Sequence, residues 1–298
     1  MGLQKEIWLN SLVENLFADN TFASRSVDLS GFVEGKTVHV PNAGGAPAVV
    51  KNRKQLPAQI SQREDKDLDY NIHEYTTDPI VLLDAEKVEL SYSKRESVVK
   101  NSRMALQDSV HADLIYDWVP SSPFSVKSSG SAVAAHVHGA TGNRKAFTKD
   151  DVFQVKDVFD VQDIPQMGRC MLLDAIMYNQ LLKTLSDSEA AAFRGLADLK
   201  RGIVGNYLGF DFYMRSKVAK ASAAGNMKAW TSEAATDSAA GIAWHDGCVS
   251  RAIGQTKLFD NENQAAYYGD VISALVRAGG QYMRSDKKGV CLIYQETA

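Results

Sequence analysis

Residues 31–90 constrain the fold of this 298-residue chain most, because they pattern as extended strands with too little apolar surface for a core. A two-stranded ribbon is at best marginally stable by itself in water. We therefore expect this arm to lie on a neighbouring copy of the chain. A long amphipathic helix at about 91–118 and a compact mixed α/β half follow it. This order favours a self-assembling shell or lattice subunit over an enzyme.

Two strand-like segments make up the arm. Residues 35–41 (GKTVHVP) read as a β-strand that a proline ends. From Leu68 to Tyr75, apolar and polar side chains alternate with the period of two that is typical of a strand. A break at Asp78-Pro79 is expected before the strand resumes at 80–83. The segment 18–35 is expected to be an irregular lead-in.

Charged residues of opposite sign lie between and along these strands. The basic residues are Lys51, Arg53 and Lys54, and the acidic run at 64–69 begins with Glu64 and Asp65. One hypothesis is that the basic tip of one copy meets acidic surface on the next, so that charge sets the register of assembly. The alternative is that both segments are simply solvated, since exposed ion pairs contribute little.

The clearest helix covers residues 91–118 and is about 40 Å long at 1.5 Å per residue. Ser93 and Glu96 have the spacing of a capping box, and Pro120 ends the helix. The apolar stripe contains Val99, Leu106, Val110, Leu114 and Trp118, flanked by Val98 and Ala105. The outer face is expected to carry Lys94, Arg95, Lys100, Arg103, Gln107 and Asp108.

The remaining segments predict an alternation of helices, strands and two long loops. Helices are expected at 3–17, at 174–185 and at 187–200. Another helix is expected to begin after a Thr148 cap, with Val152, Val155, Val158 and Phe159 facing inward. Strands are expected at 169–173, 207–213 and 289–294, while 242–253 returns to the core and 267–278 fits either strand or helix. Residues 120–147 and 219–243, rich in Ser, Gly and Ala, are expected to be loops.

Composition excludes several classes of protein. Hydrophobic content of 45% and charged content of 23% are ordinary for a soluble globular protein. The formal net charge of −3 argues against a protein whose main task is to wrap nucleic acid. Three cysteines without a CxxC pair indicate buried thiols in a reducing compartment. With no signal peptide or spanning segment in the pattern, we expect cytoplasmic synthesis and no membrane partner.

Catalytic motifs are weak throughout the sequence. His136 and His138 have the spacing of two metal ligands, but no third ligand lies nearby, so no metal or cofactor is expected. His245 and Cys248 place a base near a thiol, although catalytic pairs are rarely so close in sequence. The Gly139–Lys145 segment lacks the spacing of a phosphate loop. We therefore expect no catalytic residues.

Four segments in order resemble the major capsid protein of tailed bacteriophages. Residues 35–41 resemble the start of that family's extended loop, and 148–169 resemble its helix followed by an IPxxGR strand. Residues 201–216 (RGIVGNYLGFDFYMRS) are similar to its glycine-rich strand segment, and 243–252 to the strand and helix that follow. The matches span roughly residues 30–295, and their order carries more weight than any single motif.

The resemblance implies an α+β fold, the tailed-phage major capsid fold, with five parts along the chain. These are an N-terminal arm (1–35), an extended β-hairpin loop (36–90), a peripheral domain with a long spine helix (91–147), an axial domain (148–255) and return strands (256–298). It also implies pentamers and hexamers in an icosahedral head around double-stranded DNA. Implied partners are other copies of the chain, a scaffolding protein, a portal and decoration proteins. The implied location is the virion capsid, after synthesis in the host bacterial cytoplasm.

Two alternatives stay open at this point. An encapsulin, which is a cargo compartment with the same fold, would show the same arm and helix. A cytosolic cysteine hydrolase using Cys248 and His245 is the alternative from another class, and it requires one reactive thiol.

Overall fold

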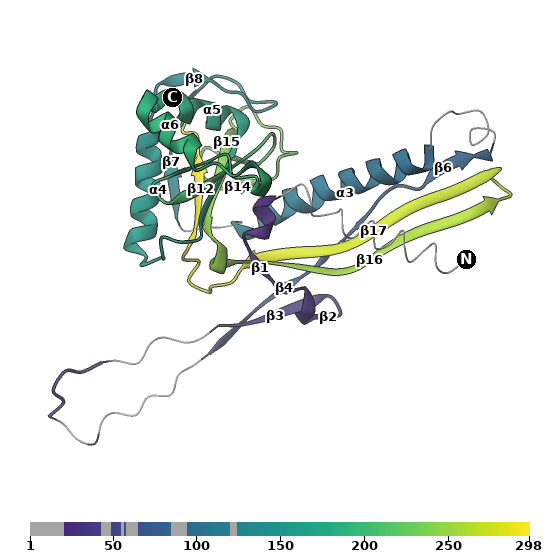
Figure 1. Ribbon diagram of the computed structural model, residues 1–298, viewed down its shortest axis with the longest axis horizontal. Helices are drawn as coiled ribbons and strands as arrows, with labels where there is room; N and C mark the ends of the chain where they lie inside the picture. Colours follow the sequence, from purple (N-terminus) through teal and green to yellow (C-terminus); the bar gives the residue numbers. More distant parts are fainter. Residues whose placement is uncertain (1–20, 43–48, 55–56, 58–64, 85–93, 120–123) are drawn as a thin grey trace.

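The computed structural model describes residues 21–42, 49–54, 57, 65–84, 94–119 and 124–298. The helix expected at 3–17 and Glu64 lie outside these residues. The described chain has a body, an elongated sheet with a long helix, and a projecting hairpin (Figure 1). Within these ranges, no helix combines the length and apolarity needed to cross a membrane.

The elongated sheet is built on one long antiparallel hairpin. Strands β16 (Val249–Gln264) and β17 (Gly269–Tyr282) pair along most of their length, with register shifts at two places. Outside them lie β1 (Val27–Asp28), parallel to β16, and β5 (His73–Thr76) and β6 (Ile80–Leu83), antiparallel to β17. The expected break between β5 and β6 is confirmed, and the undecided segment 267–278 is a strand from Gly269 onward, with Tyr267 and Tyr268 in the preceding turn.

Helix α3 (Lys94–Trp118) packs over β17 and gives this sheet its core. Buried side chains from the two elements form one cluster, namely Leu106, Val110, Leu114, Ala274, Val276 and Ala278. The predicted stripe is confirmed, with Val99 partly buried at its edge. The N-terminal end expected at 91–93 lies outside the described residues.

The predicted outer face of α3 is wrong at two positions, and Ala105 is exposed instead of flanking the stripe. Gln107 is buried, and its carbonyl oxygen lies 2.6 Å from Nδ1 of buried His111. Arg95 turns toward the sheet, where it pairs with nearly buried Asp260 and lies 3.6 Å from Asp270. Helical periodicity cannot identify a polar residue that finds its partner on another element.

The body is built on an eight-stranded mixed sheet. Its strands follow the order β11 (Gly205–Tyr207), β12 (Phe210–Arg215), β10 (Arg169–Asp174), β15 (Ser238–His245), β13 (Ala219–Ala221) and β14 (Met227–Lys228), with β18 (Val290–Tyr294) beside β15 and β7 (Ser125–Lys127) beside β18. Helices α4 (Lys149–Val161), α5 (Ala175–Thr184) and α6 (Asp187–Gly195) belong to the same unit. The strands predicted at 169–173 and 289–294 are confirmed.

Local capping explains the three helix starts. Thr148 and Asp151 form a capping box before α4, as do Ser186 and Glu189 before α6. Asp174 accepts the backbone N–H groups of Ile176 and Met177 at the start of α5. The helix predicted at 187–200 is too long, because α6 ends at Gly195 and a 3-10 turn, η3 (Leu199–Arg201), follows.

The two segments predicted as loops contain strands. Residues 120–147 hold β7, β8 (Ala132–Ala134) and β9 (Asn143–Lys145), and 219–243 hold β13, β14 and most of β15. Small residues reflect close packing here, since a Cβ at Gly241 would lie 2.7 Å from Leu173 Cδ2. Likewise, the strand expected at 207–213 is a β11–β12 hairpin whose turn places Leu208 and Gly209 at positive φ.

The projecting hairpin has its own small core at its base. Strands β3 (Thr37–Asn42) and β4 (Lys66–Asn71) pair in register, with β2 (Val33–Glu34) beside β3. Buried residues of this hairpin cluster with Ala252 of β16, and they are Val38, Val40, Tyr70 and Ile72. The expectation that residues 31–90 lack any core within their own chain is therefore wrong at the base.

Three aromatic rings join the body to the elongated sheet. The ring of Phe22, in η1 (Thr21–Ser24), lies 5.9 Å from that of Trp118 on α3 and 6.4 Å from that of Trp244 on β15. The two indoles are 5.4 Å apart, and each donates its N–H to a backbone carbonyl, of Ser250 and Arg25 respectively. Buried indoles need such a partner, so these bonds fix both ring positions.

A charge in the α3 stripe should prevent folding. Val110→Asp places an unpaired carboxylate at a 2% exposed position, and we expect a loss of more than about 4 kcal/mol. Chemical denaturation monitored by circular dichroism measures this loss. The control is Ser109→Asp on the exposed side of the same turn, and equal stability of the two variants would contradict the packing.

Candidate assembly site

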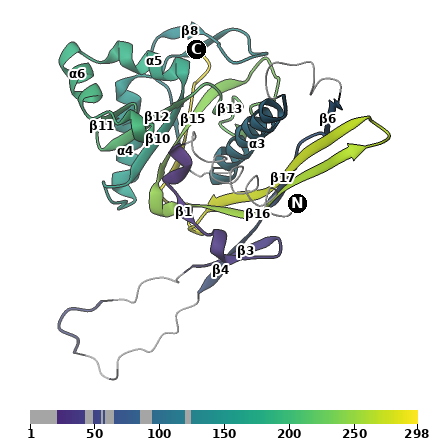
Figure 2. The same cartoon turned by 45° about the vertical axis from the view of Figure 1, so that its right-hand side comes forward.

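The distal part of the hairpin combines exposed apolar side chains with exposed basic ones. Val49 and Val50 are 94% and 53% exposed, and Lys51, Arg53 and Lys54 next to them are exposed as well. Among the described residues, these three cations make no ion pair. The segment lies far from the body in both views (Figures 1 and 2). An apolar and basic tip held away from its own subunit is suited to contact with another molecule.

The structure does not bring the predicted tip and the predicted acidic residues together. Asp65 is exposed and directly precedes β4, next to the register pair Asn42↔Lys66, whereas the basic residues lie at the far end of the hairpin. Glu64 is outside the described residues. Among the residues that the structure describes, no ion pair joins Lys51, Arg53 or Lys54 to Asp65.

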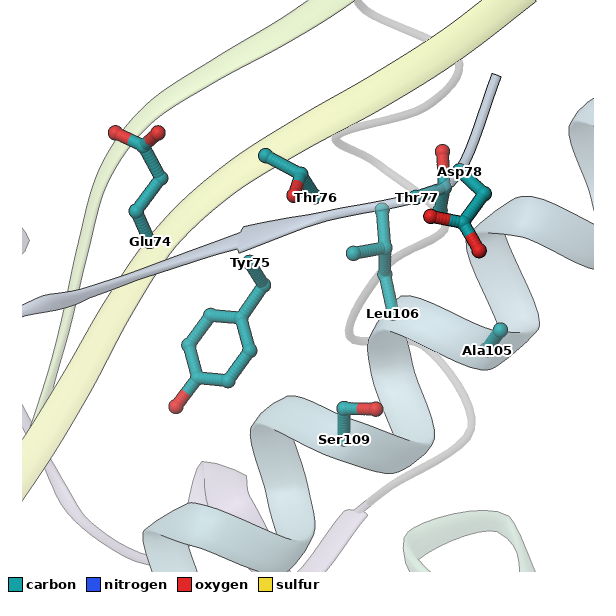
Figure 3. A pocket seen from close by; sticks show the side chains of 8 residues that line it. All are labelled: Glu74, Tyr75, Thr76, Thr77, Asp78, Ala105, Leu106 and Ser109. Atoms are coloured by element: carbon teal, nitrogen blue, oxygen red, sulfur yellow. The ribbon is translucent and has the colours of Figure 1, made fainter.

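An acidic cleft lies where β5 crosses α3, with a volume of about 460 Å³. Its lining residues are Glu74, Tyr75, Thr76, Thr77, Asp78, Ala105, Leu106 and Ser109. Figure 3 shows Tyr75 pointing toward α3, with Glu74 and Asp78 at opposite ends of the strand segment. Both charged residues of the lining are carboxylates, so the cleft favours a cationic partner.

Hydrogen bonds to neighbouring elements fix the walls of this cleft. The Thr77 N–H donates to the Ala274 carbonyl oxygen, and the Thr77 Oγ1 accepts the Ala274 N–H, both at 2.9 Å, so Thr77 is held to β17 just beyond the end of β5. The Tyr75 hydroxyl donates to the Asp113 carboxylate at 2.8 Å. Glu74 is paired with Arg277 at 2.7 Å, whereas Asp78 makes no ion pair within the described ranges. Asp78 is therefore the carboxylate available to a partner.

Helix α3 carries a pair of like charges one turn apart beside this cleft. Burial, together with the charge of Asp113, raises the pKa of Asp117 to about 7. Burial and the bond to Asp113 also raise the pKa of Tyr75, which keeps its hydroxyl neutral. This face of α3 therefore changes its charge near neutral pH.

The residue pairs suggestive of chemistry do not assemble into a catalytic or metal site. His245 is held by the backbone, since Nδ1 accepts the Gly247 N–H at 3.1 Å and Nε2 lies 2.9 Å from the Met167 carbonyl oxygen. Burial raises the pKa of Cys248 to about 11, which disfavours a reactive thiolate. All three cysteines are buried, as predicted.

The two histidines of the candidate metal pair face different partners. His136 Nε2 lies 2.5 Å from Asp174, and His138 lies 3.1 Å from Glu233. The part of the chain that the structure describes contains no group of three metal-ligating side chains.

Comparison with protein families decides which family the chain represents. A model of the phage capsid protein family matches residues 24–294, nearly the whole chain. The chain belongs to this family. Comparison with curated protein sequences finds no match. As a phage capsid protein, it is a component of a virion shell.

Solved capsid structures share the fold of this capsid protein. The capsid of the cyanophage P-SCSP1u is similar with a TM-score of 0.61 and 14% identity, covering 91% of this chain and 86% of that one. The capsid of Ralstonia phage GP4 has a TM-score of 0.61 and 12% identity, over 92% and 87% of the two chains. A virus-like particle from Pyrococcus furiosus has a TM-score of 0.57 and 8% identity, over 97% and 99%. The tailed-phage capsid fold expected from the sequence is confirmed.

Sequence reasoning identified the basic tip of the capsid protein but missed the acidic cleft. Glu74 and Asp78 are separated by about 30 residues from the α3 residues that complete the lining. Only the β5–β17 register and the position of α3 bring these segments together. The break at Asp78-Pro79 was the one local signal at this place.

The half-buried Asp117 predicts a pH dependence of stability. Because its pKa is raised in the folded state, the folded protein binds more protons than the unfolded chain between about pH 4, the ordinary value, and pH 7. Stability therefore falls as the pH rises through this window. In Asp117→Asn this fall should be reduced, and stability above pH 7 should exceed that of the wild type. Chemical denaturation from pH 4 to 8 measures the free energy of unfolding of the wild type, of Asp117→Asn and of the exposed control Asp157→Asn. The same pH dependence in all three proteins would refute the role of Asp117.

Proposed function

We propose that this chain is the major capsid protein of a tailed phage, forming pentamers and hexamers of an icosahedral head around double-stranded DNA. Family membership supports a role in a shell. The projecting hairpin is the observation that supports assembly through contacts between copies of the chain. Its tip exposes Val49 and Val50 in the single subunit. Burying these side chains on a neighbouring copy gives the hairpin a stabilising environment.

The acidic cleft between β5 and α3 is the surface that we propose for this contact. The tip supplies three cations and two valines, and the cleft supplies Asp78 together with the exposed side chain of Ala105. Opposite charges would orient the tip and set its register, while the apolar contacts supply most of the affinity. Because each subunit both donates a tip and offers a cleft, the contact is head-to-tail, the type of contact from which closed rings such as pentamers and hexamers are built.

The role is structural, without catalytic turnover. The backbone bonds of His245 and the buried thiol of Cys248 support this assignment. The proposed location is the virion, after synthesis in the host bacterial cytoplasm. Proposed further partners are a scaffolding protein, a portal and decoration proteins. The domain division expected from the sequence fits this role, with α3 as the spine of the peripheral domain.

Removing the distal hairpin should abolish closed shells without unfolding the subunit. Replacing residues 43–65 by Asn-Gly closes the Asn42↔Lys66 pair with a favoured two-residue turn and keeps the core at the hairpin base. We expect a soluble subunit with an unfolding midpoint close to that of the wild type. Electron microscopy of the purified variant reads out assembly, and normal closed particles would overturn the proposed function.

Charge reversal tests the contact between tip and cleft. Lys51→Glu/Arg53→Glu/Lys54→Glu should reduce particle yield, and Asp78→Lys/Ser109→Lys should do the same. Combining both sets restores attraction, so yield should recover. Light scattering at low salt measures the assembly rate, since exposed charges are screened at high salt. If the losses of particle yield add up in the combined variant, the tip contacts a surface other than the acidic cleft.

A further inference from the structure

A second cavity, of about 340 Å³, lies between the N-terminal segment and the end of the α6–η3 region. Its lining residues are Thr21, Ser24, Arg25, Lys200, Arg201, Ile203 and Tyr213. Three cations from two distant segments converge on this one concavity, whereas the whole chain carries a net charge of −3. The basic character of this cavity is therefore a local feature of the fold.

Close backbone packing builds this cavity. Gly202 ends η3 with φ +70°, and a Cβ placed on it would lie 1.8 Å from Thr21 Oγ1. Only glycine allows η1 and η3 to approach this closely. The approach brings Lys200 and Arg201 to the cavity that Arg25 also lines, and Arg25 is held by Asp211 at 2.6 Å.

The donors around the cavity exceed what local carboxylates use. Arg201 contacts Asp198 through Nε at 3.5 Å, a contact that does not involve its two terminal nitrogens. Lys200 makes no ion pair with any residue that the structure describes. Burial raises the pKa of Tyr213, so its hydroxyl remains a neutral donor. Two guanidinium groups, an ammonium and hydroxyl groups match a tetrahedral phosphate, which accepts more hydrogen bonds than a carboxylate does.

We propose that this cavity, which we name the basic cavity, binds a phosphate group of the nucleic-acid backbone. Lys200 and Arg201 attract the phosphate, and Arg25, Thr21 and Tyr213 orient it. Backbone contacts of this kind carry no sequence preference, as a shell around any packaged duplex requires. The nature of this ligand rests on the proposed function, because a DNA-filled head presents the duplex to the shell at high concentration.

The test uses the full chain as unassembled subunits and a labelled 20-base-pair duplex, with fluorescence anisotropy over a range of salt concentrations. Lys200→Ala/Arg201→Ala should weaken binding by about tenfold or more and reduce the slope of log K against log salt by about 1 to 2. The control Lys183→Ala/Lys217→Ala removes the same charge from exposed positions outside the cavity and should change affinity less than about twofold. The charge-conserving Lys200→Arg/Arg201→Lys should retain binding.

Three outcomes would overturn the proposal. The first is an equal loss of affinity in the cavity and control variants. The second is displacement of the duplex by inorganic phosphate at equal phosphate concentration, which indicates a site for the free ion. The third is preferential binding of a synthetic peptide of residues 64–72, which indicates an acidic segment of another copy. Electron microscopy of particles is independent of this assay, so loss of duplex binding with intact shells separates this inference from the proposed function.

Discussion

The contact among Phe22, Trp118 and Trp244 is the interaction on which the arrangement of this subunit depends. Each ring comes from a different part of the chain, namely the segment before β1, the end of α3 and the central strand β15. The same N-terminal segment continues to the elongated sheet, where Asp28 lies 3.3 Å from Arg251. Because both indoles are buried and hydrogen-bonded, the body and α3 have one defined relative orientation.

That orientation determines where the surfaces for assembly lie. The hairpin base is fixed to β16 by its own core, so β3 and β4 leave the junction in a defined direction. Helix α3 covers one face of the elongated sheet, and on the other face Phe259 is 47% exposed. The subunit thus carries apolar side chains at the tip and along the sheet that its own core does not cover. Contacts among several copies provide such a core, and many weak contacts add up to a stable shell.

Elements with a strong local signal could be predicted from the sequence. The α3 stripe, the Thr148 cap and the fully buried strands β10 and β18, each with an apolar run, follow from periodicity, capping and composition alone. The sequence predicts the β16–β17 hairpin only in part. The distal part of β16 is largely exposed, and register shifts at two places interrupt its pairing with β17. The small residues of β15 favour a loop by composition, but in the fold they permit close contact with β10.

The candidate site likewise contains residues that the sequence predicts and residues that it does not predict. Lys51, Arg53 and Lys54 could be identified because a run of like charge between strands is visible in the sequence itself. Asp78 and the basic cavity could not, because their surroundings come from segments more than 25 residues apart that only the tertiary fold brings together. The turn of Arg95 toward Asp260 was missed for the same reason.

Hydrogen–deuterium exchange compared between free subunits and assembled particles tests the central claim most directly, which is that the hairpin completes its environment on another copy. The account predicts fast exchange of residues 49–54 in the free subunit and strong protection in the particle. It also predicts that the buried strands β10 and β15 are protected equally in both states. Fast exchange of the tip in closed particles, at the rate of the free subunit, would contradict the account.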